Sequence, residues 1–454
     1  MAKLHVPTRR HILGAGIAAG AALTGLSARS GSALAQGAVT PPAGMANVNW
    51  RKQAGTTLEV NLIRSPRGET LQRYQKEFED LTGIKVNSEQ TPEQQQRQKT
   101  TIELSSGKPS FDVVHISYHV QKRQFEKGRW LADLSGFLAD TALTPPDTLS
   151  DFAEAGLTFA RSDATVGTLP FSVDYWIIYW NKELFAQRKL NYPQSFEEMV
   201  AAAEALTDAR SRTSGFVARG LRNANTPVWT SLLLGYDVDS VSNGKLNTDT
   251  PEAIEAAKLY QRLMTKSAPP GVSGFNWAEC QSAFLQGRVG MWFDGVGFAP
   301  PLEDPEKSRV VGKVGYGVMP KGPKTRAAAT TGDGLGIAAA SAKKEAAYLY
   351  LQWATSREMG ARLLQSGSGV PFRNSVLRDP AVRQGVKMPG EWVDAVAQSA
   401  PISRLALPVI IPVTEFRDTF GVALTNMISG ADPAAELKRA TEEFAPVLER
   451  SERA

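Results

Sequence analysis

Asp174 is the residue of this sequence best placed for binding chemistry. It lies in the segment Leu169–Phe185, LPFSVDYWIIYWNKELF, between Val173 and a run of aromatic and β-branched residues. Such a run is typical of a buried strand, and a carboxylate buried there without partners would be costly. We therefore expect Asp174 to lie at a turn or to meet a polar group. We interpret it as a ligand-binding carboxylate on a segment that crosses between two lobes.

Aromatic residues are concentrated in the same part of the chain. Of the nine tryptophans, those between residues 176 and 292 are Trp176, Trp180, Trp229, Trp277 and Trp292. Flat aromatic faces beside carboxylates and amides suit a carbohydrate, because its C–H face packs on the ring while its hydroxyls form hydrogen bonds. A single tryptophan is more often part of a core. Trp180, Trp277 and Trp353 are expected there from their positions.

Residues for catalysis or metal binding are scarce. Two of the four histidines precede residue 12, which leaves His115 and His119, and Cys280 is the only cysteine. These are too few for a metal site rich in histidine or cysteine. Gly332–Gly336 has the wrong spacing for a dinucleotide fingerprint and leads into a strand. We predict no catalytic residue, metal or cofactor, although paired carboxylates of a glycosidase stay open because nothing marks such a pair.

The N-terminus resembles a targeting segment. The pair Arg9-Arg10 is followed by a mild apolar stretch, Gly14–Leu26, and by Ala33-Leu34-Ala35, a pattern typical of a twin-arginine signal peptide cleaved near Ala35. The protein is then expected in a bacterial periplasm. The segment carries four basic residues and no acid, so its removal lowers the net charge from +5 to +1. A nearly neutral protein does not fit general binding of nucleic acid.

The pattern after residue 55 alternates between strands and helices. Strand-like and helix-like segments follow one another as Thr57–Ile63, Gly68–Leu81, Ile84–Ser88, Pro92–Ser106 and Phe111–Ser117. This alternation predicts an α/β fold with a parallel sheet, in which ligands bind beyond the carboxyl ends of the strands. The loops expected at that edge are Ser65–Arg67, Glu89-Gln90 and Tyr118-His119. At 454 residues, the chain is expected to form two lobes.

Several motifs occur in an order that belongs to one family. They are Asp112–Val114 through Gly128–Leu134, Tyr179–Phe185, Phe284–Met291 followed by Gly295, and Gly334–Ala338 with the helical segment Lys343–Ala354. The chain resembles the extracellular solute-binding proteins of the sugar-binding class that serve ABC transporters (family 1, which includes maltose-binding protein). Each motif is degenerate, but their order extends across nearly the whole chain.

The resemblance implies a two-lobed periplasmic binding protein of the Venus-flytrap type, with hinge segments and a helical C-terminal portion. It implies a signal peptide at 1–35 and a flexible leader at 36–55. The first lobe would contain residues 56–170 plus 325–366, and the second lobe residues 171–324 plus 367–454. The implied partners are a small carbohydrate or polyol and the permease subunits of an ABC transporter in the inner membrane. The protein is expected to be a monomer.

The residues expected to bind the ligand come from the motifs and from the loops at the sheet edge. They are Arg67, Tyr118, His119, Asp174, Tyr175, Trp176, Arg222, Asn225, Trp229, Asp294, Phe298, Asp333 and Arg373. Asp174, His119 and an Arg or Asn from Arg219–Asn225 would bind hydroxyls. His119 replaces an acid that is common in the family, and Phe298 replaces a frequent tryptophan.

The leading hypothesis is a binding protein that closes on a sugar or polyol and delivers it to the permease. Two alternatives stay open at this point. One is the same fold binding a charged small solute such as a polyamine. The other is a secreted carbohydrate-active enzyme.

Overall fold

One long strand, β6 (Thr168–Asn181), connects the two parts of the fold in the computed structural model, which describes residues 40–162 and 165–453. The first half of β6 pairs antiparallel with β12 (Ala328–Ile337), from Thr168 opposite Gly336 to Tyr175 opposite Thr330. Its second half pairs instead with β10 (Val289–Gly295) and β11 (Val314–Gly317). The exchange of partners occurs between Tyr175 and Trp176, so Asp174 lies within a strand and not at a turn.

The sheet order is β2-β1-β3-β12-β6-β10-β7, and three further strands attach to its sides. The remaining strands are β1 (Thr57–Ile63), β2 (Lys85–Thr91), β3 (Val113–Ser117), β4 (Arg161–Ser162), β5 (Thr165–Val166), β7 (Ser214–Val217), β8 (Val241–Ser242), β9 (Lys245–Leu246), β13 (Val370–Pro371) and β14 (Ser403–Leu405). The parallel pairing of β1 with β2 and β3 agrees with the α/β class predicted from the alternation.

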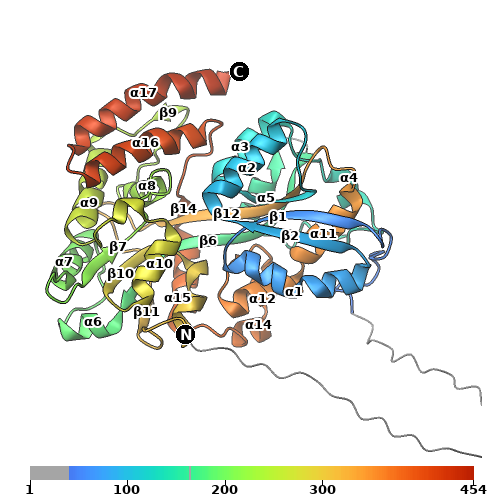
Figure 1. Ribbon diagram of the computed structural model, residues 1–454, viewed down its shortest axis with the longest axis horizontal. Helices are drawn as coiled ribbons and strands as arrows, with labels where there is room; N and C mark the ends of the chain where they lie inside the picture. The colour runs from blue at the N-terminus through green and yellow to red at the C-terminus, as the bar shows by residue number, and fades with distance from the viewer. Residues whose placement is uncertain (1–39, 163–164, 454) are drawn as a thin grey trace, which may run out of the picture. The chain divides into compact units, whose positions relative to one another are not determined.

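Helices cover both parts of this sheet (Figure 1). They are α1 (Pro66–Thr82), α2 (Glu93–Ser105), α3 (Tyr118–Gly128), α4 (Ser135–Ala139), α5 (Glu154–Ala160), α6 (Lys182–Gln187), α7 (Phe196–Leu206), α8 (Thr226–Leu234), α9 (Pro251–Lys266), α10 (Trp277–Leu285), α11 (Lys344–Ala354), α12 (Arg357–Ser366), α13 (Asn374–Arg378), α14 (Pro380–Gln384), α15 (Gly390–Ser399), α16 (Val413–Ile428) and α17 (Pro433–Arg453). Short 3₁₀ turns include Val272–Gly274, Val296–Phe298, Pro300–Glu303 and Ala400–Ile402. Within the described ranges, no helix has the length and apolar character to cross a membrane.

Helices α1, α2 and α3 begin at the carboxyl ends of the first strands, which is how their first turns come to surround one site. Ser65 caps α1: its Oγ accepts from the backbone N–H of Gly68, and Pro66 occupies the first helical position, where a missing N–H costs nothing. Gly83 ends α1 in the left-handed conformation, with φ of 73°. α2 begins at Glu93, directly after β2.

The hydrophobic core has two clusters. The smaller one packs β1, β2 and α1 against α11, with Phe78, Tyr350 and Trp353 in mutual ring contact. The larger one includes Trp229 and Trp292 and extends under α16 and α17. Burial of this much apolar surface is the main term that stabilises the fold.

Residues 40–55 differ from the flexible leader expected there. Met45, Val48 and Trp50 are buried in the smaller core cluster, and Nε1 of Trp50 donates to the carbonyl of Met45 at 3.1 Å. Glycine, proline and alanine in this segment suggested flexibility, but its three large apolar side chains attach it to the core. The predicted signal peptide, residues 1–35, lies outside the described residues.

The segment after residue 367 also contacts both parts of the fold. Its helices are those predicted for the C-terminal portion, with α16 and α17 packed on α9. Residues near β13, however, contact the first part: the N–H of Ala153 donates to the carbonyl of Phe372, and Arg373 pairs with Asp151. The lobe boundary predicted at 366 therefore separates residues that touch, and the predicted lobe limits stay a prediction.

Candidate functional site

A small cavity of about 40 Å³ lies where the carboxyl ends of the strands meet the loops that follow them. It is lined by Ile63, Ser65, Arg67, Glu93, Arg97, His115, Ser117, His119, Asp174, Trp176, Arg219, Pro227, Trp277, Phe298, Thr331, Asp333 and Arg417. At roughly 10–15 Å³ for each water-sized position, the space corresponds to about three or four waters. The edge of the sheet at which it lies is the one predicted from the alternation of strands and helices.

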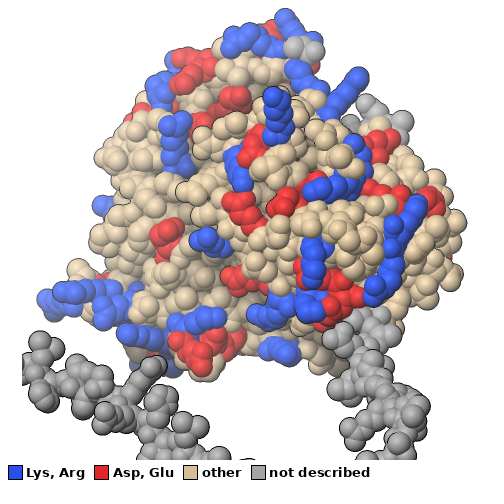
Figure 2. Space-filling view, turned by 45° about the vertical axis from the view of Figure 1, so that its right-hand side comes forward, with Lys and Arg blue, Asp and Glu red and all other residues tan. Residues whose placement is uncertain are grey.

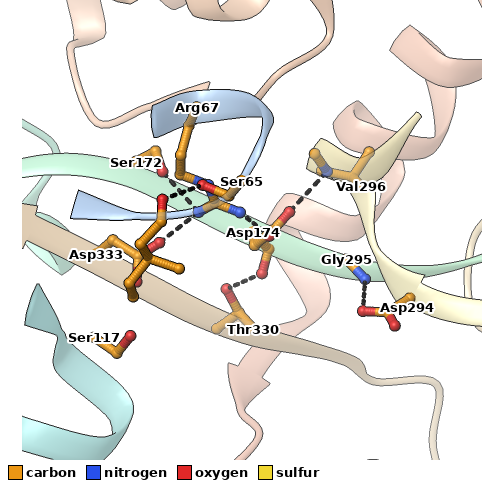
Figure 3. Close-up of polar contacts among 12 residues, drawn as sticks. Ser65, Arg67, Ser117, Ser172, Asp174, Asp294, Gly295, Val296, Thr330 and Asp333 are labelled. Carbon is orange, nitrogen blue, oxygen red and sulfur yellow. Dashed lines mark hydrogen bonds and ion pairs between the residues drawn. The ribbon is translucent and has the colours of Figure 1, made fainter. Parts of the chain in front are cut away.

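Arg67 is the centre of one half of this wall. Its Nη2 donates to Asp174, while its Nη1 donates to Asp333 and, at 2.9 Å, to Oγ of Ser172 (Figure 3). All four side chains are nearly or completely buried. A charged guanidinium fork between two carboxylates is a strong hydrogen-bonding arrangement, and it supplies the partner that a buried Asp174 requires.

Asp174 has further partners that fix its position. Its Oδ1 accepts from the backbone N–H of Gly297 at 2.8 Å, and its carbonyl accepts from Oγ1 of Thr330 at 3.1 Å. A Cβ added at Gly295 would lie 2.7 Å from the Asp174 carboxylate. Glycine at 295 thus permits the close approach of the chain to this carboxylate.

Asp333 receives donors from two elements. In addition to Arg67, Nε2 of His115 lies 3.4 Å from its Oδ2, and Nδ1 of His115 accepts from the backbone N–H of Ile63. Burial would raise the pKa of Asp333, but the charge of Arg67 and the proximity of His115 outweigh it and lower the pKa below its ordinary value. Asp333 is therefore a fixed negative charge at neutral pH.

Arg219 and aromatic rings form the opposite wall. Nε and Nη2 of Arg219 bind both oxygens of Asp294, which is completely buried beneath it. The guanidinium lies 4.8 Å from the ring centre of Trp176 and 5.6 Å from that of Phe298. Trp277 stacks on Phe298 at 4.7 Å with 14° between the rings. This wall therefore contains an aromatic surface and the guanidinium of Arg219, which Asp294 fixes in position.

A third group of residues is charged and incompletely hydrogen-bonded. Nη2 of Arg97 contacts Glu93 at 2.6 Å and donates to Oγ of Ser117 at 3.0 Å. Its Nε and Nη1 are buried and have no hydrogen-bond partner among the described residues. Arg417 is 2% exposed, and Nε donates to the carbonyl of Asn223 at 3.1 Å. Two donors of the buried Arg97 guanidinium are therefore unsatisfied among the described residues.

His119 lies beside this group and is neutral at physiological pH. Burial and then the charge of Arg97 lower the pKa of His119 to about 3. Its Nε2 lies 3.5 Å from Nη2 of Arg97, and its buried Nδ1 has no partner among the described residues. For Glu93, burial would raise the pKa, but Arg97 and other arginines lower it to about 2.

The charges of the site balance. Four arginines line the cavity, and they face three lining carboxylates plus Asp294 beneath Arg219. With His119 neutral, the arrangement provides donors and acceptors of both signs without a net charge. It can bind a ligand whose groups both donate and accept, as hydroxyls do. Over the described part of the chain, no group of three or more His, Cys, Asp and Glu residues could hold a metal ion.

A family model described as "Bacterial extracellular solute-binding protein" matches residues 64–361. The chain belongs to this family. The match includes the strand ends and loops that contribute most of the cavity wall, and it confirms the family predicted from the order of motifs.

This solute-binding protein is similar to several known proteins. It is 26% identical to an erythritol/L-threitol-binding protein of Mycolicibacterium smegmatis, over 95% of this chain and 94% of the relative. It is 25% identical to a probable amino-acid ABC transporter periplasmic-binding protein of Sinorhizobium fredii, over 83% and 86%. A solved ABC transporter solute-binding protein from Agrobacterium radiobacter K84, in complex with ribitol, superposes with a TM-score of 0.79 at 25% identity, covering 87% of this chain and 99% of that one. The two-lobed fold predicted for the solute-binding protein is thereby confirmed.

The structure brings about half of the predicted binding residues together. Those that line the cavity of the solute-binding protein are Arg67, His119, Asp174, Trp176, Phe298 and Asp333. Asp294 lies directly behind the wall and holds Arg219. These residues come from five separate segments, which only the fold makes adjacent.

The other predicted residues lie elsewhere. Tyr118 lines a neighbouring cavity of about 560 Å³, where its ring stacks on Phe159, and Tyr175 lines a groove of about 670 Å³. Arg222 is exposed and lies 3.7 Å from Asp418. Tyr118 begins α3, Tyr175 lies in β6 and Arg222 lies in a turn. The local sequence did not reveal which way these side chains point.

Asn225, Trp229 and Arg373 have structural contacts instead. Nδ2 of Asn225 donates to the carbonyls of Gly220 and Gly421, which joins α8 to α16. Trp229 is completely buried and stacks on Phe420. Arg373 pairs with Asp151 and lies over the ring of Phe152.

Several residues of the wall were not among the predicted ones. Glu93 and Arg97 are four residues apart on a helix that was predicted only as polar, and this i, i+4 pair at a helix start was the available signal. Trp277 was expected in the core but is half-buried at the cavity. Arg417 gave no local signal, because α16 reaches the site through tertiary packing, which includes its contacts with α3, α8 and α9.

Proposed function

We propose that this chain is the substrate-binding component of an ABC importer that takes an acyclic polyol or a small sugar into the cavity and delivers it to the membrane permease. The observation that carries the proposal is the balance of four arginines and four carboxylates around a small space. Each hydroxyl of a polyol donates one hydrogen bond and accepts others, so it is matched by a carboxylate on one side and a guanidinium on the other.

Two relatives support this class of ligand. One is named as an erythritol/L-threitol-binding protein, and the ribitol complex is the structure compared above. Erythritol, L-threitol and ribitol are short chains with one hydroxyl on each carbon. The aromatic surface of Trp176 and Phe298 would pack against the C–H groups of such a chain.

We propose that Arg67, His119, Asp174, Trp176, Phe298 and Asp333 contact the ligand, with Arg97, Arg219, Trp277 and Arg417 added from the structure. Closure would follow the usual two-state scheme, in which a ligand that touches both lobes favours the closed form. The ligand would be released unchanged to the permease, as transport by a member of this family requires.

Export is part of the same proposal. The twin-arginine pattern before Ala35 and the extracellular family support a periplasmic protein. We propose that this protein acts as a monomer. N-terminal sequencing of the protein recovered from a periplasmic fraction tests the cleavage near Ala35, and size-exclusion chromatography with light scattering tests the oligomeric state.

Calorimetry with a panel of ligands tests the binding function. We expect erythritol, L-threitol, ribitol or D-mannitol to bind with micromolar affinity or better and to raise the melting temperature. Putrescine and neutral amino acids are included because a charged solute was the alternative and one relative is named for amino acids. Binding of putrescine or an amino acid without binding of any polyol or sugar contradicts the proposal, as does chemical change of the recovered ligand in its NMR spectrum.

A further inference from the structure

Glu93 is a carboxylate that lies among three arginines of the cavity wall. Its Oε1 lies 2.6 Å from Nη2 of Arg97, and its Oε2 lies 3.7 Å from Nη1 of Arg219. The side chain is only 12% exposed, and Arg417 is the third guanidinium that acts on it. Glu93 begins α2, where a negative charge is also favoured by the helix dipole.

The three arginines around Glu93 have few other acceptors. Arg219 shares Asp294 through two hydrogen bonds. Nε and Nη1 of Arg97 lack hydrogen-bond partners among the described residues, and Nε of Arg417 donates to the carbonyl of Asn223. A buried cluster of this kind without Glu93 would be an anion site, since guanidinium groups bind carboxylates and phosphates strongly.

The rest of the cavity does not supply a substitute for Glu93. Asp174 and Asp333 both form ion pairs with Arg67 at the other wall, so they do not neutralise the arginines around Glu93. Removal of Glu93 would leave the charges of Arg97 and Arg417 uncompensated within the cavity wall, because Asp418, the other acid that acts on Arg417, is 42% exposed and lies outside the wall. Conversely, an anionic ligand in the present site would lie beside a buried carboxylate, and like charges at close range in a buried site repel strongly.

We infer that Glu93 is a specificity-determining residue, which excludes anionic solutes and keeps the cavity selective for uncharged polyhydroxy ligands. The inference rests on the proposed function and deepens it. Glu93 belongs to α2, whereas Arg219 follows β7 and Arg417 lies on α16. Selection between neutral and anionic ligands therefore depends on groups from both sides of the site: the arginines attract polar groups of the ligand, and Glu93 repels an anion.

The experiment compares Glu93→Gln with the wild type on matched ligands. Ribitol and D-ribonate, and erythritol and D-erythronate, share a carbon chain and differ in one terminal carboxylate. For the wild type we expect the neutral member to bind roughly tenfold more tightly or better. For Glu93→Gln we expect the ratio of the two dissociation constants to shift toward the anion by about tenfold or more, and the gain to shrink when sodium chloride is raised.

Asp418→Asn is the matched control. Asp418 also acts electrostatically on Arg417, but its side chain is 42% exposed and it is not part of the cavity wall. This variant should leave the ratio unchanged. Adding Arg417→Met to Glu93→Gln should reverse the gain, because it removes one of the uncompensated cations. The ratio is measured on one protein preparation, so it does not depend on the fraction that is folded.

The outcomes separate two failures. If the wild type binds the neutral ligand and Glu93→Gln leaves the ratio unchanged, or Asp418→Asn shifts it equally, the inference on Glu93 is wrong while the proposed function stands. If the wild type binds no polyol or sugar, the proposed function is wrong and the inference fails with it. A shift confined to Glu93→Gln and reversed by Arg417→Met supports the inference.

Discussion

Arg67 donates through Nη2 to Oδ2 of Asp174, and neither side chain is more than 6% exposed. The same guanidinium binds Asp333 through Nη1. A buried carboxylate requires a partner, and Arg67 supplies one to both Asp174 and Asp333. It thereby offsets the cost of burying two acids near the point where β6 changes its pairing partners.

Replacing Arg67 should therefore destabilise the whole fold. We expect Arg67→Met to lower the free energy of unfolding by about 3–5 kcal/mol, because two buried carboxylates lose their shared cation. Urea unfolding followed by circular dichroism measures this change. The control is Arg222→Met: Arg222 forms an exposed pair with Asp418 at 3.7 Å, whose removal should cost about 1 kcal/mol or less. Equal losses in the two variants would contradict the role given to Arg67.

Gly295 should be intolerant of a side chain. An added Cβ would lie 2.7 Å from the carboxylate of Asp174, so Gly295→Ala must push that carboxylate away from Arg67. We expect a loss of ligand affinity of roughly tenfold or more and lower thermal stability. Gly136→Ala is the comparison, because nothing lies within 4 Å of its added Cβ. An affinity of Gly295→Ala equal to that of Gly136→Ala would show that the position of Asp174 does not matter for binding.

The sequence predicted the general arrangement well and the side-chain directions poorly. Alternation of strands and helices indicated the α/β class, and the loops after the first strands indicated where Arg67 and His119 would lie. Trp229 was predicted at the site and Trp277 in the core, because the local pattern of a helix-like segment does not show which tryptophan faces a cavity. The structure buries the first against Phe420 and leaves the second half-buried at the cavity.

The position of Arg417 at the cavity could not be predicted from local sequence patterns. It lies in a helix of the C-terminal portion, far along the chain from every other residue of the wall, and the packing of α16 on α3, α8 and α9 brings it to the cavity. Pairing of Glu93 with Arg219 likewise depends on how two separate parts of the chain are placed. Contacts of this kind are set by tertiary packing and not by periodicity.

Trp277 should contribute to binding more than to stability. Its ring is half-buried and stacks on Phe298 at the cavity, so Trp277→Leu should weaken ligand binding by roughly tenfold, the loss of about 1.4 kcal/mol that one aromatic face can supply. Trp180→Leu is the matched control, since Trp180 is also half-buried but contacts Phe185 and Tyr192 away from the cavity. Calorimetry on both variants measures the difference. Similar affinities in the two would remove Trp277 from the site.

His119 should make stability depend on pH in a definite direction. Its pKa is lowered to about 3 in the folded protein, from an ordinary value of 6.5, by burial and by Arg97. Arg417 acts in the same direction, and Asp333 and Glu93 oppose it. Between these two values the unfolded chain binds the proton and the folded protein does not. The stabilising contribution is therefore complete above pH 6.5 and declines as pH falls toward 3, by up to about 1.4 kcal/mol for each pH unit.

The variant His119→Asn isolates this contribution. The difference in unfolding free energy between the wild type and the variant should change by about 1–2 kcal/mol between pH 7 and pH 5, a range above the ordinary pKa of Glu93. Urea unfolding at fixed ionic strength over this range measures it, with the wild type losing more stability on acidification than the variant. Parallel stability curves for the two proteins would mean that His119 is protonated in the folded state, and the neutral donor and acceptor assigned to it at the cavity would then be wrong.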